Sequence, residues 1–330
     1  MKSTLAHLLN HQTLDRATAH KTLLGIGRGD YNSAQIASFL TIFALRGLTA
    51  EELGGFRDAM LELCLSLDLS AYDPMDLCGT GGDGKDTFNI STLASFVVAG
   101  AGQRVAKHGN HGVSSAVGSS TIMEYLGYQF SNDSDKITRQ IETADICYLH
   151  APLFHPAMKN VAPIRKELGV KTFFNMLGPL TNPAFLRKQL VGVFSLELMR
   201  LYAYIYQQSE TNFLIVHALD GYDEVSLTGD FKIITARNEQ ILSPKNLGLE
   251  TFAPSELAGG HTLADSARIF LNVLNNQATP AQKQAVVANA ALALHAANPN
   301  LLLLDAVAAA QESLESKRAL ACFKKLIDSK

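Results

Sequence analysis

The stretch Asp76-Leu-Cys-Gly-Thr-Gly-Gly-Asp-Gly-Lys85 has four glycines in six positions, and Lys107-His-Gly-Asn110 follows about twenty residues later. Glycine has no Cβ and adopts positive φ readily, so the N–H groups of such a loop can surround a phosphate. Asp83 would repel a phosphate unless the ligand brings Mg²⁺ or the carboxylate contacts sugar hydroxyls. Lys107 and His108 would add a positive second wall. Together the two blocks predict a site for a phosphorylated sugar.

Strand and helix patterns alternate around this loop. Short strands are predicted at 75–78 and 103–106, with an apolar helix at 91–100 between them. A strand, loop, helix and strand in this order favour a parallel sheet with sites at the carboxyl ends of its strands. Further elements are predicted along the chain: strands at 146–149, 190–194 and 213–217, a helix at 199–208, and strand-like turns at 225–235.

The N-terminal segment, residues 3–68, has helical spacing and almost no strand pattern. Ser33 is a candidate N-cap, and Thr49 with Glu52 matches a capping box. Residues 155–168 also read as a helix, which Pro163 would kink and the following glycine would end.

The C-terminal tail is rich in alanine and helical, and begins with Thr279 as a cap before Pro280. We therefore expect an α/β protein with two domains. A small all-helical N-terminal domain would cover 1–70, joined by part of 155–185. A large α/β domain with a mostly parallel central sheet flanked by helices would cover 71–330.

Composition excludes several classes of function. A formal net charge of −3 over 330 residues provides no basic field for a nucleic-acid backbone. The four cysteines form no C-x-x-C pair, which argues against zinc and disulfides and fits a reducing compartment. The N-terminus lacks a long apolar segment, and the apolar runs are too short to span a bilayer. We expect a cytoplasmic protein that binds neither nucleic acid nor membrane.

The glycine loop taken alone is compatible with several ligands. Gly79, Gly81 and Gly84 fit the G-x-G-x-x-G dinucleotide pattern, but the next strand ends in Lys107-His108 where an acid should hold the ribose. The same loop fits the start of a P-loop, but Asp86 stands where Ser or Thr is required. A glycine-rich turn without a ligand remains an alternative.

Six blocks of the chain resemble the anthranilate phosphoribosyltransferases in their order and spacing. They are Gly79-Thr-Gly-Gly-Asp83, Asn89-Ile-Ser-Thr92, Lys107-His-Gly-Asn110, His155-Pro-Ala-Met-Lys159, Phe174-Asn-Met-Leu-Gly-Pro-Leu-Thr-Asn-Pro183 and Asp220-Gly-Tyr-Asp-Glu-Val-Ser-Leu-Thr-Gly229. The resemblance covers essentially the whole chain. It implies transfer of the phosphoribosyl group of phosphoribosyl diphosphate (PRPP) to the amine of anthranilate, with release of diphosphate, in tryptophan biosynthesis. It also implies the fold of the pyrimidine nucleoside phosphorylases, a hinge between domains where the substrates meet, and a homodimer formed through the helical domain.

The resemblance also assigns site residues. For PRPP these are Gly79, Gly81, Gly82, Asp83, Thr87, Asn89, Ser91, Thr92, Lys107 and Ser119. For anthranilate they are Gly79, His108, Asn110, Arg165 and Gly178. For Mg²⁺ they are Ser91, Asp223 and Glu224.

The chemistry of these residue types agrees with the assigned roles. N–H groups at a helix start favour phosphate, Mg²⁺ binds through one or two carboxylates plus substrate oxygens, and a guanidinium can hold a carboxylate with two hydrogen bonds. Each residue alone has a simpler alternative: Ser91 as a plain cap, Asp223-Glu224 as a solvated acidic turn, Arg165 as a surface charge and His108 as a structural histidine.

Two positions depart from the family pattern. His111 follows Lys107-His-Gly-Asn110 where members often have Arg, and Thr121 stands where they often have an acid. A nucleoside phosphorylase of the same fold and a non-catalytic relative that binds nucleic acid are the alternatives. Arg165 and the Phe174–Pro183 block argue against the first, and the net charge with the intact Asp223-Glu224 pair argues against the second.

Overall fold

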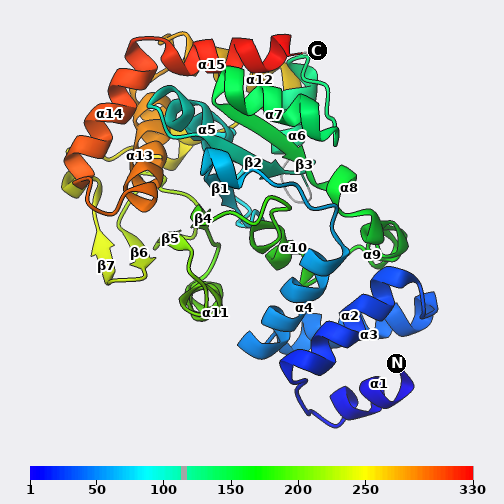
Figure 1. Ribbon diagram of the computed structural model, residues 1–330. Coiled ribbons are helices and arrows are strands. Elements are labelled where there is room, and N and C mark those ends of the chain that lie inside the picture. The colour runs from blue at the N-terminus through cyan, green and yellow to red at the C-terminus, as the bar shows by residue number, and fades with distance from the viewer. Residues whose placement is uncertain (113–116, 330) are drawn as a thin grey trace. The chain divides into compact units, whose positions relative to one another are not determined.

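The computed structural model describes residues 1–112 and 117–329 (Figure 1). The chain forms two compact units. The first contains Met1–Leu67 and Ala151–Phe185, and the second contains Asp68–His150 and Leu186–Lys330. The segment 151–185 thus returns to the first unit before the chain completes the second one.

The second unit is built on a mostly parallel sheet in the order β1-β4-β5-β6-β7. Its strands are β1 (Asp76–Gly79), β4 (Lys188–Gly192), β5 (Asn212–Ala218), β6 (Phe231–Thr235) and β7 (Glu239–Leu242). The first three run parallel, and β6 and β7 are antiparallel. Residues 231–235, expected to be strand-like turns, therefore form a regular strand, because β5 provides a full set of backbone partners.

Strands β2 (Val105–Gly109) and β3 (Ile146–His150) form a separate parallel pair. The prediction that the strands flanking the glycine loop share one sheet is only partly right. They meet through a single parallel bridge between Met75 and Val105, just before β1 begins. The strand starts at Val105 and not at 103, because the backbone pairing with β3 begins there.

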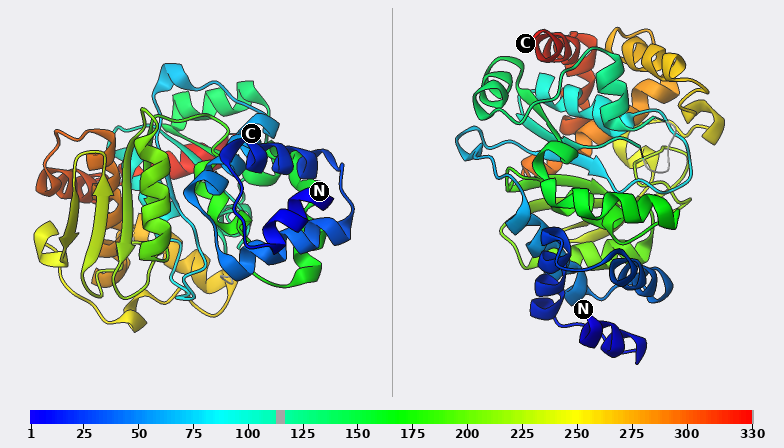
Figure 2. Two further views of the ribbon diagram at one scale, coloured as in Figure 1. Left: turned by 90° about the horizontal axis from the view of Figure 1, so that it is seen from below. Right: turned by 90° about the vertical axis from the view of Figure 1, so that its right-hand side faces the viewer.

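Helices cover both faces of the larger sheet (Figure 2). Helices α5 (Ile90–Gly100) and α13 (Pro280–Ala297) pack on one face, against β1 and against β4 and β5 respectively. Helix α11 (Leu196–Gln207) packs against β5 and β6 on the other face. The remaining helices of this unit are α6 (Ser119–Tyr125), α7 (Ser134–Ala144), α12 (Leu263–Leu274), α14 (Leu303–Glu315) and α15 (Arg318–Asp328).

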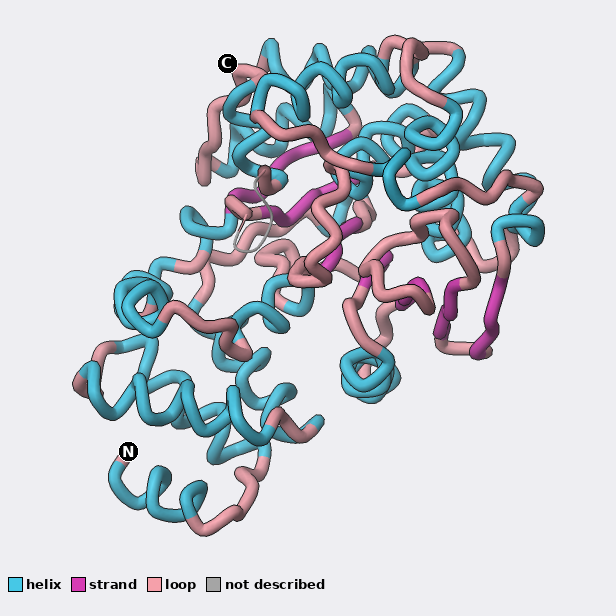
Figure 3. The backbone as a smooth tube through the Cα atoms, turned by 180° about the vertical axis from the view of Figure 1, so that it is seen from behind, coloured by secondary structure: helices cyan, strands magenta, loops and turns pink. Residues whose placement is uncertain are grey.

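The first unit consists of helices and loops, whereas all strands of the described chain lie in the second (Figure 3). Its helices are α1 (Lys2–Leu9), α2 (Arg16–Arg28), α3 (Ser33–Arg46), α4 (Ala50–Leu63), α8 (Ala151–Phe154), α9 (Ala162–Leu168) and α10 (Phe174–Leu177). Thr49 and Glu52 form the predicted capping box of α4. The cap of α3 is Asn32 and not Ser33, because the Asn32 side chain accepts from the backbone N–H of Gln35.

The predicted single helix over 155–168 is wrong. A 3₁₀ turn at Pro156–Asn160 precedes α9, and Pro163 lies in the first turn of α9. Proline is tolerated there because an N–H group in the first turn has no helical partner. Gly169, with φ of +64°, ends the helix as predicted.

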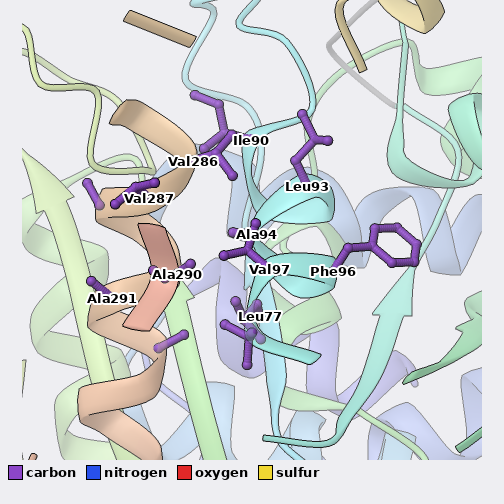
Figure 4. Close-up of a cluster of buried hydrophobic side chains, with 14 of the residues drawn as sticks. Leu77, Ile90, Leu93, Ala94, Phe96, Val97, Val286, Val287, Ala290 and Ala291 are labelled. Carbon is purple, nitrogen blue, oxygen red and sulfur yellow. The ribbon is translucent and has the colours of Figure 1, made fainter. Parts of the chain in front are cut away.

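The core of the second unit lies between the sheet and its helices (Figure 4). Leu77 of β1, Val97 of α5 and Ala290 of α13 are fully buried there. Alanines along α13 let this helix approach α5 and the sheet closely, which explains why an alanine-rich helix occupies the centre. The first unit has a separate core of phenylalanines, in which Phe56 and Phe173 stack with ring centres 4.5 Å apart.

Candidate active site

Two glycines make room for an acidic residue at the carboxyl edge of the sheet. Gly79 of β1 is paired with Gly192 of β4. A Cβ on Gly79 would lie 2.3 Å from Asp223 Oδ2, and a Cβ on Gly192 would lie 1.5 Å from the Asp223 backbone oxygen. Gly81, with φ of +64°, donates its N–H to Asp223 Oδ2 at 2.6 Å. The glycine loop is therefore folded onto Asp223.

Glu224 connects the same loop to the start of α5. Its Oε1 accepts from the backbone N–H of Ser91 at 3.0 Å, and its Oε2 accepts from Thr87 Oγ1 at 3.4 Å. The positive end of the helix dipole favours a carboxylate at this position. The three residues predicted to bind Mg²⁺, Ser91, Asp223 and Glu224, thus line one small pocket in the second unit.

Asn289 on α13 fixes the backbone directly after the acid pair. Its Oδ1 accepts from the Val225 N–H at 3.0 Å, and its Nδ2 donates to the Val225 carbonyl at 2.9 Å. The amide thus satisfies both backbone groups of Val225 as a neighbouring strand would. Asn289 is 3 % exposed, so water cannot replace these bonds.

The acid pair is electrostatically unbalanced. Burial raises the pKa of Asp223 well above its usual range, and the charges of Glu224 and Asp83 raise it further. Burial, followed by the charge of Asp83, raises the pKa of Glu224 to about 7, although Lys107 opposes the shift. Three carboxyl groups therefore face one another with too little positive charge nearby, which favours binding of a cation.

The donor set also fits a cation that is completed by a substrate. Among residues 1–112 and 117–329, no group of three or more His, Cys, Asp or Glu side chains is placed to hold a metal ion. Two carboxylates plus ligand oxygens suit Mg²⁺, which keeps waters and rarely has an all-protein cage. Two hydroxyls beside the loop, Thr80 Oγ1 and Thr92 Oγ1, are buried and make no hydrogen bond within the described part of the chain.

The rest of the glycine loop is half-buried at Gly82 and Asp83, is exposed at 84–86, and turns on itself. Gly82 has φ of +82°, and Asp83 Oδ1 accepts from the backbone N–H of Lys85 at 3.1 Å. Asn89, just before α5, donates from Nδ2 to the backbone oxygen of Val117 at 3.0 Å.

Lys107 and His108 do not form the positively charged, solvent-accessible second side of the site that the sequence predicts. They lie inside the second unit and are 2 % and 6 % exposed. The Lys107 ammonium donates to the Leu77 carbonyl at 2.6 Å, and the His108 backbone N–H donates to Asp76 Oδ1 at 3.2 Å. Lys107 therefore acts here as a buried countercharge behind the glycine loop.

Ser119 and Asn110 lie together at the start of α6. Ser119 Oγ donates to the Asn110 carbonyl at 3.2 Å, and the hydroxyl of Tyr148 donates to Ser119 Oγ at 2.8 Å. The two departures from the family pattern also meet here, because His111 Nδ1 lies 3.3 Å from Thr121 Oγ1.

Arg165 and Gly178 belong to the first unit, whereas the other candidate residues belong to the second. Arg165 donates to Asn175 Oδ1 at 3.1 Å, and its guanidinium lies 5.3 Å from the ring centre of Phe174. Burial lowers its pKa. Within the described ranges no carboxylate pairs with Arg165. A Cβ on Gly178 would meet open space.

Three residues of the site, Gly192, Asn289 and Tyr148, were not predicted from the sequence. Gly192 could have been found, because it lies inside the predicted strand 190–194 and a glycine within a strand indicates close backbone approach. Asn289 and Tyr148 carry no local pattern, since a buried asparagine on an alanine-rich helix and a tyrosine in a strand are common. Only their partners show what they do.

Comparison with known proteins agrees with this architecture. Residues 2–64 match the helical bundle domain of a glycosyl transferase family, and residues 71–320 match the α/β domain of the same family. The fold and the site thus define a two-domain glycosyl transferase.

Individual relatives are more specific. The chain is 56 % identical over 327 residues to an anthranilate phosphoribosyltransferase of Cytophaga hutchinsonii, covering 99 % of this chain and 100 % of the relative. It is similar to the solved enzyme of the same name from Thermus thermophilus, with a TM-score of 0.92, 32 % identity and 98 % of each chain covered. It is also similar to the Saccharomyces cerevisiae enzyme in complex with PRPP and Mg, with a TM-score of 0.92, 30 % identity, and 99 % and 96 % of the two chains covered. The chain belongs to the anthranilate phosphoribosyltransferases.

Proposed function

We propose that this protein transfers the 5-phosphoribosyl group of PRPP to the amine of anthranilate and releases diphosphate, a step of tryptophan biosynthesis. The observation that carries the proposal is the glycine loop folded onto the Asp223–Glu224 pair at the start of α5. The similarity to the family indicates the substrates. The yeast relative was solved in complex with PRPP and Mg, and also in complex with 4-fluoroanthranilate.

We assign PRPP to the second unit. N–H groups of the glycine loop and the start of α5 would hold phosphate oxygens, and Thr80 and Thr92 supply hydroxyls that lack a partner in the described chain. Asp83 would meet ribose hydroxyls, as its carboxylate would otherwise repel the diphosphate. Ser119 would donate to a phosphate oxygen.

Asp223, Glu224 and Ser91 would hold Mg²⁺ together with substrate oxygens. When bound, Mg²⁺ supplies positive charge that stabilises the departing diphosphate. The residues fit this role because the acid pair is buried and repels itself. The positive charge of Lys107, behind the glycine loop, offsets part of the negative charge of the acid pair.

We assign the carboxylate of anthranilate to Arg165. A guanidinium can bind a planar carboxylate with two parallel hydrogen bonds, and no acid competes for Arg165 within the described chain. The face of Phe174 beside it keeps the guanidinium in place.

The transfer needs positioning more than acid–base chemistry. The bond between C1 of the ribose and the diphosphate oxygen breaks as the amine nitrogen bonds to C1, through an oxocarbenium-like transition state. The aryl amine is neutral at pH 7, so its lone pair is available without a strong base, and its proton leaves after the bond forms. Fixed donors at the diphosphate lower the barrier by stabilising the charge that develops there.

We also infer a cytoplasmic homodimer formed through the first unit. Leu9 at the end of α1 and Leu45 on α3 are 67 % and 84 % exposed, so both side chains are available to a partner. The four cysteines are free thiols, as expected in a reducing compartment. None of the helices in the described ranges is long and apolar enough to span a lipid bilayer. Light scattering of the wild type and of Leu45→Glu tests the dimer, which this charge should weaken.

Anthranilate fluorescence tests the reaction directly. We expect the signal to fall when protein, PRPP and Mg²⁺ are mixed, and to stay constant when PRPP is omitted or EDTA is added. Cleavage of a pyrimidine nucleoside by inorganic phosphate, without loss of anthranilate, would instead establish the nucleoside phosphorylase alternative.

A further inference from the structure

A chain of buried polar groups runs from β3 to the first turn of α6. The hydroxyl of Tyr148, a residue 1 % exposed, donates to Ser119 Oγ at 2.8 Å and lies 3.1 Å from Ser120 Oγ. Ser120 Oγ lies 2.9 Å from His150 Nδ1. At the other end, Ser119 Oγ donates to the Asn110 carbonyl at 3.2 Å. The four side chains therefore form one continuous path to the loop after β2.

Proton counting gives this path a direction. Each hydroxyl has a single proton, and that of Tyr148 is given to Ser119. Ser120 must then donate to the Tyr148 oxygen, so that His150 must donate from Nδ1 to Ser120. Burial, followed by the charge of His111, lowers the pKa of His150 to about 4, so the ring is neutral and has one N–H to give. The path therefore requires the Nδ1–H tautomer of His150.

The surroundings hold this path in place. A Cβ on Gly109 would lie 2.0 Å from the Tyr148 hydroxyl and 2.7 Å from Ser119 Oγ, so only glycine leaves room for their contact. Phe130 stacks on His150 with ring centres 4.2 Å apart. Ser120, the other serine that contacts the Tyr148 hydroxyl, is fully buried, so its hydroxyl cannot bond to water instead.

We propose that Tyr148 is a positioning residue for the phosphate site, which makes Ser119 Oγ a hydrogen-bond donor to a phosphate oxygen of PRPP. The inference rests on the proposed function, in which Ser119 contacts that phosphate. A serine that accepts from Tyr148 must point its own proton elsewhere, toward Asn110 in the free protein and toward phosphate when PRPP is bound. Phosphate oxygens accept and do not donate at neutral pH, so Ser119, whose oxygen accepts from Tyr148, needs only to turn its own proton from Asn110 to the phosphate.

The first test compares two tyrosine variants. Tyr148→Phe removes only the hydroxyl oxygen, and we expect the Kd and KM for PRPP to rise about 3- to 10-fold. The anthranilate KM and kcat should stay within about twofold of wild type, because the Tyr148 hydroxyl bonds to Ser119 and Ser120, neither of which is assigned to anthranilate. Tyr128→Phe is the matched control. Tyr128 is 3 % exposed and its ring centre lies 5.8 Å from that of Tyr148. Its hydroxyl donates to Gln140 Oε1 at 2.9 Å and not to a serine of the path, so loss of that hydroxyl should leave PRPP affinity unchanged.

A double-mutant cycle with Ser119→Ala shows whether Tyr148 acts through Ser119. Ser119→Ala should itself weaken PRPP binding, and Tyr148→Phe should then cause no further loss in that background. Additive losses in the double variant, or a Ser119→Ala variant with full PRPP affinity, would overturn the inference.

Nitrogen-15 NMR of the wild type tests the direction of the path without any substitution. We expect His150 to be protonated on Nδ1, and an Nε2–H tautomer would contradict the proposal even if the variants fail to fold. A wild type that binds no PRPP in calorimetry would overturn the proposed function as well. A wild type that binds PRPP, with Tyr148→Phe binding it equally well, would overturn only this inference.

Discussion

At the residue scale, the acid pair shows how a site can oppose stability. Asp223 is buried and Glu224 beside it is half-buried, and Asp83 adds a third charge. Their raised pKa values mean that the ionised form is less favourable in the folded chain than in water. The two carboxylates therefore destabilise the free protein at neutral pH and become favourable only with a cation between them and the substrate.

We predict opposite effects of neutral amides at these positions on activity and on stability. In Asp223→Asn and Glu224→Gln, kcat/KM with PRPP and Mg²⁺ should fall about 100-fold or more, equivalent to about 3 kcal/mol. The melting temperature without ligand should rise, because a buried repulsion is removed. Steady-state kinetics and calorimetry measure the two effects. Asp230→Asn, an exposed acid in the turn before β6, is the control. Near-normal turnover of the double variant in EDTA would contradict the prediction.

We predict that Arg165 contributes to binding of anthranilate and not to binding of PRPP. A charge-assisted hydrogen bond contributes roughly 1.5–3 kcal/mol, so the anthranilate KM of Arg165→Ala should rise about 10- to 100-fold. Direct titration should show nearly unchanged PRPP binding, since the proposed phosphate groups belong to the other unit. Lys166→Ala, an exposed cation on the same helix, should leave both substrates unaffected. Lost PRPP affinity with an unchanged anthranilate KM would place Arg165 at the phosphates.

His155 should make the protein sensitive to acid. It is 4 % exposed, its Nε2 lies 3.0 Å from the Thr181 carbonyl, and burial lowers its pKa to about 4. The pKa in the unfolded chain is about 6.5, so between the two values the unfolded state binds a proton that the folded state does not. The free energy of unfolding is therefore retained in full above pH 6.5 and falls, by up to about 3 kcal/mol, as the pH drops to 4.

Melting temperatures between pH 7.5 and 4.5 check this dependence. His155→Gln keeps a nitrogen donor for Thr181 but does not titrate, so it should lose less stability on acidification than the wild type. His11→Gln, at an exposed position, should behave like the wild type. Parallel curves for all three proteins would show that His155 does not cause the loss.

At the element scale, α13 does more than fill the core. Its alanines allow close packing on α5 and the sheet. Its Asn289 forms hydrogen bonds to the backbone N–H and carbonyl of Val225, directly after the acid pair. The glycine loop is held from a second direction as well. The Phe88 N–H donates to the Leu257 carbonyl at 3.2 Å, and the Gly259 N–H donates to the Asp86 carbonyl at 2.9 Å. The loop is thus positioned by elements far from it in sequence.

Asn289→Ala should weaken both the fold and the cation site. It leaves the N–H and carbonyl of Val225 buried without partners, which costs about 2–4 kcal/mol for the two groups. Because Val225 follows Glu224 directly, the Mg²⁺ concentration needed for half-maximal activity should also rise. Urea unfolding and a Mg²⁺ titration measure these changes. Gln284→Ala on the same helix, which loses only bonds to exposed Glu250, should alter neither one substantially.

At the scale of the whole molecule, the chain builds two cores. The first unit packs around phenylalanines of α3, α4 and the segment before α10, and the second around the sheet with α5 and α13. The proposed PRPP groups all belong to the second unit. A ligand that binds only the folded form stabilises it by about 2.7 kcal/mol at a hundredfold excess over Kd.

Hydrogen exchange should locate this stabilisation. With PRPP and Mg²⁺, the amides of 79–92 and 223–225 should exchange more slowly, because the ligand orders the loop and the turn. Amides of α3 serve as the internal reference. Protection confined to the first unit would show that PRPP is bound by other residues than those proposed.

Much of the local structure could be predicted from short stretches. The capping box at Thr49, the helix start at Pro280 and the stop at Gly169 depend on neighbouring residues only, and the structure confirms them. The predictions that failed depended on distant partners. Residues 231–235 became a strand because β5 pairs with them, and the first strand after α5 turned out to pair with β3.

The sequence by itself determined the fold class, the glycine loop and the family, because residue type and spacing encode backbone freedom, capping and six ordered motifs. Only the tertiary structure decided that Lys107 is a buried countercharge, that Asn289 holds the acidic turn and that Tyr148 directs Ser119. Each of these roles belongs to a pair of groups separated by 29 or more residues. Hydrogen bonding and desolvation act over a few ångströms in space, so such roles exist only after the chain has folded.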